Sequence, residues 1–328
     1  MRIRDRGALT AFICATALAV VAAQGSTNAT PVPQNAPKPL YTPDTMLRRI
    51  AAEQNAAPAA QRQGPGAEQN AALGYWMAFA QMKEMPVGGS ARDTDALLDA
   101  NAAALATLAR ATRMTACDWG IDYALGPNAP IAHLPKARAL ARVNSAAAVR
   151  AMGRGRGDEA VDQWLVGMRF ARHIESGGTL IATLTAWNAL RNTWSGLEPW
   201  VVEKKLSAAQ RSRLADAVRM LPETVFHWDT AVLNEARVLQ VAAQSATSGG
   251  GSAAPPTEAE TKRFLREIER VGDAFTRSPD ETAVVIAAYM KETGVHRFYR
   301  ESMPSLTKTN ETRREVKAER ERLLALLK

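Results

Sequence analysis

The side chains best suited to chemistry gather in one irregular stretch, residues 115–133. It contains a thiol, two carboxylates, a phenol and an imidazole: Cys117, Asp118, Asp122, Tyr123 and His133. Cysteine, histidine and carboxylate groups can together ligate zinc, and a cysteine beside a histidine can act as a nucleophile with its base. The alternative is structural, with the aromatic rings filling a gap between helices and the two Asp capping helix ends.

The spacing of these residues matches no compact metal motif, and no His-Glu-x-x-His sequence occurs. We therefore predict neither a bound metal nor a cofactor. The sequence also lacks the Gly-x-Ser-x-Gly elbow, a phosphate loop and a dinucleotide fingerprint. The other histidines lie far apart. His173 is predicted to be solvated, on the helix face opposite the apolar stripe, and His227 stands beside Trp228 with no second signal of function.

A second candidate is a basic face. Eight Lys and Arg side chains but only three carboxylates fall between residues 134 and 172. Such a surface could bind a polyanion, for example an envelope polymer or anionic lipid headgroups. The alternative is an ordinary solvated surface with local ion pairs. The residues assigned to this candidate basic face are Lys136, Arg138, Arg142, Arg154, Arg156 and Arg172.

The N-terminus has the pattern of a secretory signal peptide over residues 1–23. Arg2, Arg4 and Arg6 precede an apolar run from Ala8 to Ala23 that ends in small residues. The run is short for a membrane span, so we expect cleavage after Ala23, no transmembrane span afterwards, and a periplasmic or extracellular location. Export argues against nucleic acid as a partner. Cleavage would remove three Arg and one Asp, which changes the net charge from +8 to +6.

Cysteine usage supports a fold without disulfides. Cys14 would leave with the signal peptide, and Cys117 would then be the one cysteine remaining. An intramolecular disulfide is then impossible, and we expect this thiol to be buried.

Composition divides the rest of the chain into four parts. Residues 24–66 form a Pro/Ala-rich tether with one short helix, and residues 67–246 form the main helical domain. Residues 247–256 form a Gly/Ser/Pro linker or loop. Residues 257–328 form C-terminal helices that we expect to pack on the main domain.

The candidate residues must be positioned by helices, because apolar residues recur at helical spacing and strand signals are almost absent. Capping boxes at Ser207, Thr257 and Ser278 mark three helix starts. The fold is predicted to be all-α, an irregular helical bundle or a short α-solenoid of antiparallel hairpins. The predicted helices span residues 67–83, 93–114, 135–152, 158–174, 179–198, 223–245, 258–275, 280–302 and 305–327, with a further helix starting at Ser207.

Three segments carry a resemblance. They are Ala116-Cys117-Asp118-Trp119-Gly120, the run from His133 to Arg142, and Ala171-Arg172-His173-Ile174. Over about residues 67–225 the chain resembles a group of uncharacterised exported α-helical bacterial proteins. The resemblance implies a helical fold and carries no known activity.

The leading functional prediction is a non-enzymatic binding or scaffold protein of the cell envelope or extracellular space. Its partner would be an envelope polyanion or another protein. The rival prediction is a hydrolase or metal-dependent enzyme with its site at the Cys117–Asp122 loop and His133, near Arg172 and His173.

Overall fold

Every regular element in the part of the chain that the structure describes is a helix, which confirms the predicted all-α class. The structure, a computed structural model, describes residues 69–83, 91–246, 255–292 and 294–328. Within these ranges lie twelve α-helices, one 3-10 helix and no strand. The predicted signal peptide, the tether with its short helix and most of the 247–256 linker fall outside the described residues.

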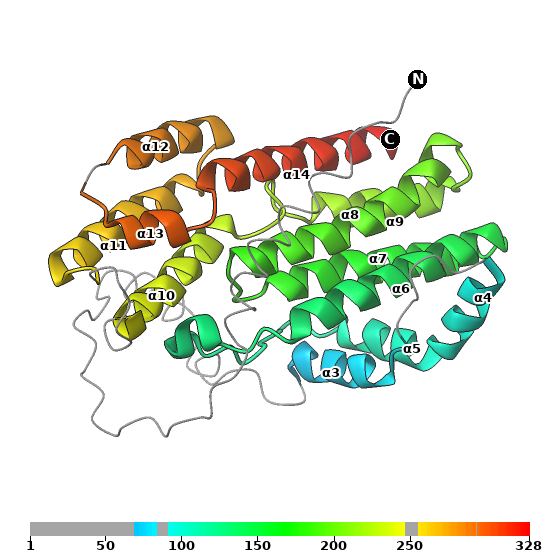
Figure 1. Ribbon diagram of the computed structural model, residues 1–328. Coiled ribbons are helices and arrows are strands. Elements are labelled where there is room, and N and C mark those ends of the chain that lie inside the picture. The colour runs from blue at the N-terminus through cyan, green and yellow to red at the C-terminus, as the bar shows by residue number, and fades with distance from the viewer. Residues whose placement is uncertain (1–68, 84–90, 247–254, 293) are drawn as a thin grey trace. The chain divides into compact units, whose positions relative to one another are not determined.

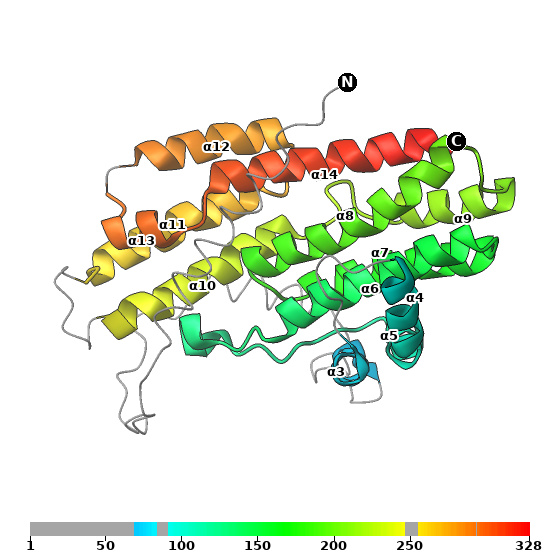
Figure 2. The same cartoon turned by 45° about the vertical axis from the view of Figure 1, so that its right-hand side comes forward.

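None of the described helices combines the length and the hydropathy needed to cross a membrane. Their bounds are α3 (Ala71–Gln81), α4 (Ala91–Ala100), α5 (Ala102–Ala111), η3 (Tyr123–Asn128), α6 (His133–Gly153), α7 (Gly157–Glu175), α8 (Leu180–Val202), α9 (Ala208–Arg219), α10 (Trp228–Ala246), α11 (Glu258–Ala274), α12 (Pro279–Lys291), α13 (Arg297–Ser302) and α14 (Leu306–Leu326). Short connections join α6 to α7, at residues 154–156, and α7 to α8, at residues 176–179 (Figures 1 and 2).

Helices α6, α7 and α8 pack against one another and form the centre of the core. Small residues let them approach closely. A Cβ atom on Gly167 of α7 would lie 2.5 Å from the hydroxyl oxygen of Thr193 in α8. Trp164 of α7 is fully buried in this core. The close contact fixes the C-terminal end of α7, where the candidate site lies.

The single helix predicted over residues 93–114 is wrong, because α4 and α5 are separated at Asn101. This buried residue has φ −97° and ψ 5°. Its amide group donates to the carbonyls of Lys83 and Leu97, and its oxygen accepts from the backbone N–H of Lys83. A side chain that satisfies two backbone groups of Lys83, after α3, and one of Leu97, in α4, stabilises a break between α4 and α5.

Two other predicted helices also differ from the structure. The helix expected over 280–302 is divided into α12 and α13. The helix expected from Glu223 starts later, at Trp228, because Val225 has φ 66°. A β-branched residue at positive φ cannot continue a right-handed helix. The preceding turn positions His227 directly before α10.

The three predicted capping boxes are confirmed. Ser207, Thr257 and Ser278 each accept a hydrogen bond from the backbone of the third helical residue, whose side chain returns a bond to the cap. These boxes fix the starts of α9, α11 and α12.

The last described helix, α14, packs against α8, α9 and α12. Arg322 forms a two-pronged ion pair with Glu198 of α8. The guanidinium of Arg320 donates to the carbonyl of Leu221, just after α9, at 3.1 Å. Helix α14 therefore connects the central helices to the C-terminal ones.

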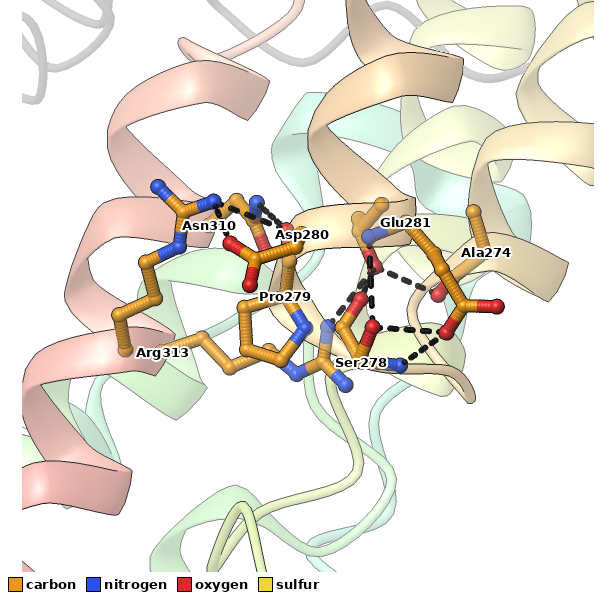
Figure 3. Close-up of polar contacts among 9 residues, drawn as sticks. Ala274, Ser278, Pro279, Asp280, Glu281, Asn310 and Arg313 are labelled. Carbon is orange, nitrogen blue, oxygen red and sulfur yellow. Dashed lines mark hydrogen bonds and ion pairs between the residues drawn. The ribbon is translucent and has the colours of Figure 1, made fainter.

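A buried arginine joins α14 to the corner between α11 and α12 (Figure 3). Arg313 is 1% exposed, and its guanidinium donates to the Thr282 hydroxyl at 3.0 Å and to the carbonyl of Arg277. The same guanidinium lies 5.5 Å from the centre of the Phe275 ring. Burial lowers the pKa of Arg313, while Glu223 and Asp229 oppose that shift. Neighbouring Asn310 donates to the carbonyl of Pro279 at 2.7 Å.

Candidate functional site

The five residues of the predicted polar cluster do not converge on one point. Asp118 accepts from the backbone N–H of Gly120 at 2.8 Å, and Asp122 caps η3 by accepting from Ala124 at 2.9 Å. The Tyr123 hydroxyl donates to the carbonyl of Gly177. Among the described residues, no group of three or more His, Cys, Asp and Glu could hold a metal ion.

Trp119 anchors the irregular stretch to the helices around it. Its ring stacks on His133 with centroids 4.3 Å apart and on Tyr75 at 5.6 Å. Its indole N–H donates to the carbonyl of His173 at 2.7 Å. Burial lowers the pKa of His133 to about 4, so this imidazole is neutral at pH 7. Trp119 and His133 therefore act as packing residues here.

A polar cavity of about 410 Å³ lies beside this anchor, between the 115–117 segment, the end of α7, the turn to α8 and the start of α10. Its volume falls in the range of small-molecule sites, roughly 300–1,000 Å³. The cavity includes one residue of the predicted polar cluster and one of the predicted basic face. Its lining residues are Thr115, Cys117, Arg172, His173, Glu175, Ser176, Gly177, Gly178, His227 and Thr230.

A carboxylate–imidazole pair forms one wall. Glu175 is 5% exposed. One of its oxygens lies 2.8 Å from Nδ1 of His227, and the other accepts from the backbone N–H of His227 at 3.0 Å. The hydrogen bond to Glu175 raises the pKa of His227 and outweighs the opposing effect of burial. Because Nδ1 is held by Glu175, Nε2 is the ring atom left to meet a ligand.

Arg172 lies near the same carboxylate. Its Nε atom is 3.6 Å from Glu175, too long for a hydrogen bond. That nitrogen is buried and has no hydrogen-bond partner among the described residues. Because Arg172 lines the cavity, its guanidinium group can bind an acceptor on a ligand.

The thiol in this cavity is poorly suited to nucleophilic attack. Burial, with a further contribution from Asp118, raises the pKa of Cys117 to about 12, although a hydrogen bond with the Ala72 backbone opposes the shift. The thiolate is the reactive form of cysteine. Cys117 is therefore an uncharged thiol at neutral pH, and it is half-buried where the sequence predicted a buried thiol.

The prediction that His173 is solvated is wrong. Helix α3 covers that face of α7, and Nδ1 of His173 forms a 2.5 Å hydrogen bond with the Tyr75 hydroxyl. Burial, helped by the neighbouring positive charge of Arg172, lowers the pKa of His173 to about 4. This histidine contributes a neutral ring to the cavity.

The turn between α7 and α8 is held from three sides. Ser176 donates to the carbonyl of Cys117 at 2.7 Å, and Asn234 of α10 donates to the carbonyls of Gly177 and Gly178 at 3.1 Å each. Glu235 accepts from the backbone N–H of Leu180 at 3.2 Å. Burial raises the pKa of Glu235 to about 7. These contacts give the cavity a fixed floor.

The six residues of the predicted basic face fall into three environments. Arg154 pairs with Asp95 at 2.9 Å and Arg156 with Glu159 at 2.7 Å, as in the ion-pair alternative. Arg172 lines the cavity. The other three are exposed on α6 and form no ion pair within the described ranges: Lys136, Arg138 and Arg142.

Comparison with known proteins gives no match to a family model, to a curated protein or to a solved structure.

Sequence reasoning missed the two central residues of this site, Glu175 and His227. They are 52 positions apart, and no motif relates them. The turn with Val225 at positive φ and the position of Glu175 at the last turn of α7 bring them together. The one usable signal in the sequence was the group of polar residues at the end of α7, Arg172, His173 and Glu175.

Proposed function

We propose that this protein is an exported, non-enzymatic binding protein whose 410 Å³ cavity takes a small anionic ligand. The observation that carries the proposal is that Arg172 and His227 both line this cavity. Their counter-charge, Glu175, is already engaged by both the ring and the backbone of His227.

The charge balance of the cavity supports an anion. Of its lining residues, Arg172 is positive, Glu175 is an acid and His227 is an imidazole with a raised pKa. When His227 is protonated, these three groups sum to one positive charge. The flat guanidinium of arginine matches a carboxylate or a phosphate. Hydroxyl groups of Thr115 and Thr230 on the same lining add neutral hydrogen-bonding groups.

Binding is favoured over catalysis because the cavity offers no activated nucleophile. The pKa of the Cys117 thiol is about 12, and the Ser176 hydroxyl is committed to a backbone carbonyl. The residues of the rival prediction are dispersed, with Asp118, Asp122 and His133 outside the cavity lining.

A second candidate function is hydrolysis with His227 as a general base. Its support is the Glu175–His227 pair, because a carboxylate that holds Nδ1 of a histidine orients Nε2 to accept a proton. Arg172 would then stabilise the negative charge that develops on the substrate.

The test is isothermal titration of the full chain with small mono- and dicarboxylates and with inorganic phosphate, together with Arg172→Gln. We expect binding that weakens by roughly tenfold or more, since a hydrogen bond to a charged group is worth about 1.5–3 kcal/mol. Arg142→Gln is the matched control, because it removes an exposed charge from α6. Loss of binding in Arg142→Gln but not in Arg172→Gln would overturn the cavity proposal in favour of the α6 surface.

A turnover assay distinguishes the second candidate function, hydrolysis, from binding alone. Hydrolysis of an activated ester is compared between wild type and His227→Gln. Saturable turnover that His227→Gln abolishes would replace the binding proposal. An equal background rate in both proteins would leave binding as the function.

The export part of the proposal has its own test. Expression of the full chain in a bacterial host, followed by fractionation and mass spectrometry, should yield a product that begins at residue 24. A product that retains residues 1–23 in the cytoplasm would overturn export without affecting the cavity.

A further inference from the structure

A second, smaller cavity of about 230 Å³ lies on α5, α7 and α9 and shares no lining residue with the first. Three of its side chains are arginines and one is a carboxylate. The full lining is Ala109, Arg113, Asp162, Gln163, Leu165, Val166, Arg169 and Arg213.

The charges of this cavity do not cancel. Asp162 is bound to Arg213, with 2.6 Å between the carboxylate oxygen and the guanidinium nitrogen. Arg113 and Arg169 are exposed and form no ion pair with any residue that the structure describes. The charged lining groups therefore sum to two positive charges, in a concave site where the field of both arginines overlaps.

Gln163 lines the same cavity and carries an unsatisfied acceptor. The side-chain oxygen of Gln163 is buried and has no hydrogen-bond partner in the described part of the chain. A buried acceptor without a donor is costly to the fold, and a ligand that brings a hydroxyl group removes that cost. The amide of Asn144 meets the backbone carbonyl of Gln163, at 2.9 Å, and leaves the side-chain oxygen available.

The cavity is held by three packed helices. Asp162, Val166 and Arg169 recur every three or four residues on one face of α7. Arg113 follows the end of α5, and Arg213 belongs to α9; both helices contact α7. Val166 is buried in the α7 core, so the face on which the ligand would lie is fixed before binding.

We propose that this cavity binds a phosphate ester that carries a neighbouring hydroxyl group, as glycerol phosphate does. Arg113 and Arg169 hold the phosphate oxygens, and the side-chain oxygen of Gln163 accepts from the hydroxyl. The small apolar wall of Ala109, Leu165 and Val166 contacts the carbon chain. The volume is below that of a typical drug-sized site, which suits one headgroup. That group can come from a soluble ester or from a lipid headgroup.

The test is titration of the full chain with glycerol 3-phosphate, with inorganic phosphate and with glycerol. We expect glycerol 3-phosphate to bind best, glycerol not to bind, and the affinity to fall as salt rises. Arg169→Gln and Arg113→Gln should each weaken binding by roughly tenfold. Arg138→Gln, which removes an exposed and unpaired charge from α6, should change it little.

The substitution Asp162→Asn should increase the affinity, where the arginine substitutions decrease it. It removes the carboxylate that neutralises Arg213, so glycerol 3-phosphate should bind several-fold more tightly. A purely structural role for Asp162 would not improve binding. Equal affinity in wild type, Arg169→Gln and Asp162→Asn would overturn the proposal.

Two further experiments identify whether the phosphate ester is soluble or part of a lipid, and show which of the two cavities binds it. Vesicles with phosphatidylglycerol in phosphatidylcholine are compared with the soluble ester, and in either arm loss of binding in Arg169→Gln supports the site. The same titration in Arg172→Gln should retain binding in the second cavity. If Arg172→Gln removes all phosphate binding while Arg169→Gln removes none, the ligand occupies the first cavity and this inference fails.

Discussion

Glu175 stabilises two different parts of His227 at once, its backbone N–H and its ring. The carboxylate is buried, and the imidazole is 59% exposed and faces the cavity. The pair therefore connects the protonation state of an accessible ring to the fold of the turn before α10.

The first prediction concerns Glu175→Gln. Loss of the carboxylate removes the main cause of the raised pKa of His227, so the midpoint of this ring should fall in an NMR titration. In the wild type, binding of an anion in the first cavity should weaken as pH rises through the raised pKa. The interaction stabilises the fold fully below the unfolded pKa of about 6.5 and is lost as pH rises through the folded pKa.

Glu203→Gln is the matched control, because Glu203 is exposed and, among the described residues, forms an ion pair only with Lys205. It should leave the His227 midpoint where it was. An unchanged midpoint in Glu175→Gln as well would mean that the hydrogen bond does not set the pKa.

At the scale of residues, the sequence allowed some site residues to be predicted and not others. Cys117 and Arg172 were singled out by type and surroundings, and both line the first cavity. His173 was misplaced because the periodicity of one helix does not show that α3 lies over it. Glu175 was not singled out, because its partner His227 is distant in sequence.

Helix α7 combines a tightly packed face in the core with a polar C-terminal end. Its core face depends on Gly167, which brings α8 and Asn144 of α6 close. Its polar end supplies Arg172, His173 and Glu175 to the first cavity. Its other exposed positions supply Asp162 and Arg169 to the second cavity.

The second prediction compares Gly167→Ala with Gly153→Ala. A methyl group at Gly167 would lie 2.5 Å from Thr193 Oγ1 and 3.1 Å from Asn144 Nδ2. We expect a loss of about 1–3 kcal/mol in the free energy of unfolding, measured in urea, because the core is overpacked. Gly153 has open space around it, so alanine there should be neutral or stabilise by up to about 1 kcal/mol. Similar midpoints for both variants would contradict the close packing of α7 and α8.

The third prediction concerns the cap of α12. Ser278→Ala removes the hydroxyl that accepts from Glu281 and should cost about 1 kcal/mol of unfolding free energy. Ser212→Ala makes the same change at an exposed position inside α9, where no cap is lost, and should be neutral or slightly stabilising. Thermal melts followed by circular dichroism distinguish the two.

At the scale of elements, local signals predicted helix starts better than helix continuity. The capping boxes at Ser207, Thr257 and Ser278 use groups within four residues, so the sequence contains all the information they need. The break at Asn101 depends on backbone groups of Lys83, 18 residues away. No propensity within residues 93–114 could reveal it.

For the whole molecule, the arrangement of α14 ties the C-terminal helices to the central ones. Arg313 reaches the α11–α12 corner, while Arg320 and Arg322 reach α9 and α8. A substitution of Arg313 should therefore also destabilise the central helices.

The fourth prediction is that Arg313→Met lowers the unfolding free energy by about 2–3 kcal/mol, because the carbonyl of Arg277 and the Thr282 hydroxyl each lose a hydrogen bond from a buried charged donor. Neighbouring Arg314→Met removes an exposed ion pair with Asp280 and a long, 3.3 Å hydrogen bond to the carbonyl of Pro279, and it should cost less than about 1 kcal/mol.

Two probes show whether the effect spreads. All seven tryptophans precede α11, so tryptophan fluorescence reports on the central helices and circular dichroism on all helices. In Arg313→Met both midpoints should fall together. A fluorescence midpoint that stays at the wild-type value would show that residues 257–328 unfold independently.

The contacts of α14 also constrain the order in which the molecule can fold. Lys317 pairs with Glu223 across 94 residues and Arg322 with Glu198 across 124, so these contacts close late, after large losses of chain entropy. During synthesis, α8 and α9 emerge long before the helix that covers them. The packing of α14 on α8 and α9 must therefore wait until residues 306–326 have been synthesised, so the nascent chain exposes the faces of α8 and α9 that α14 later covers.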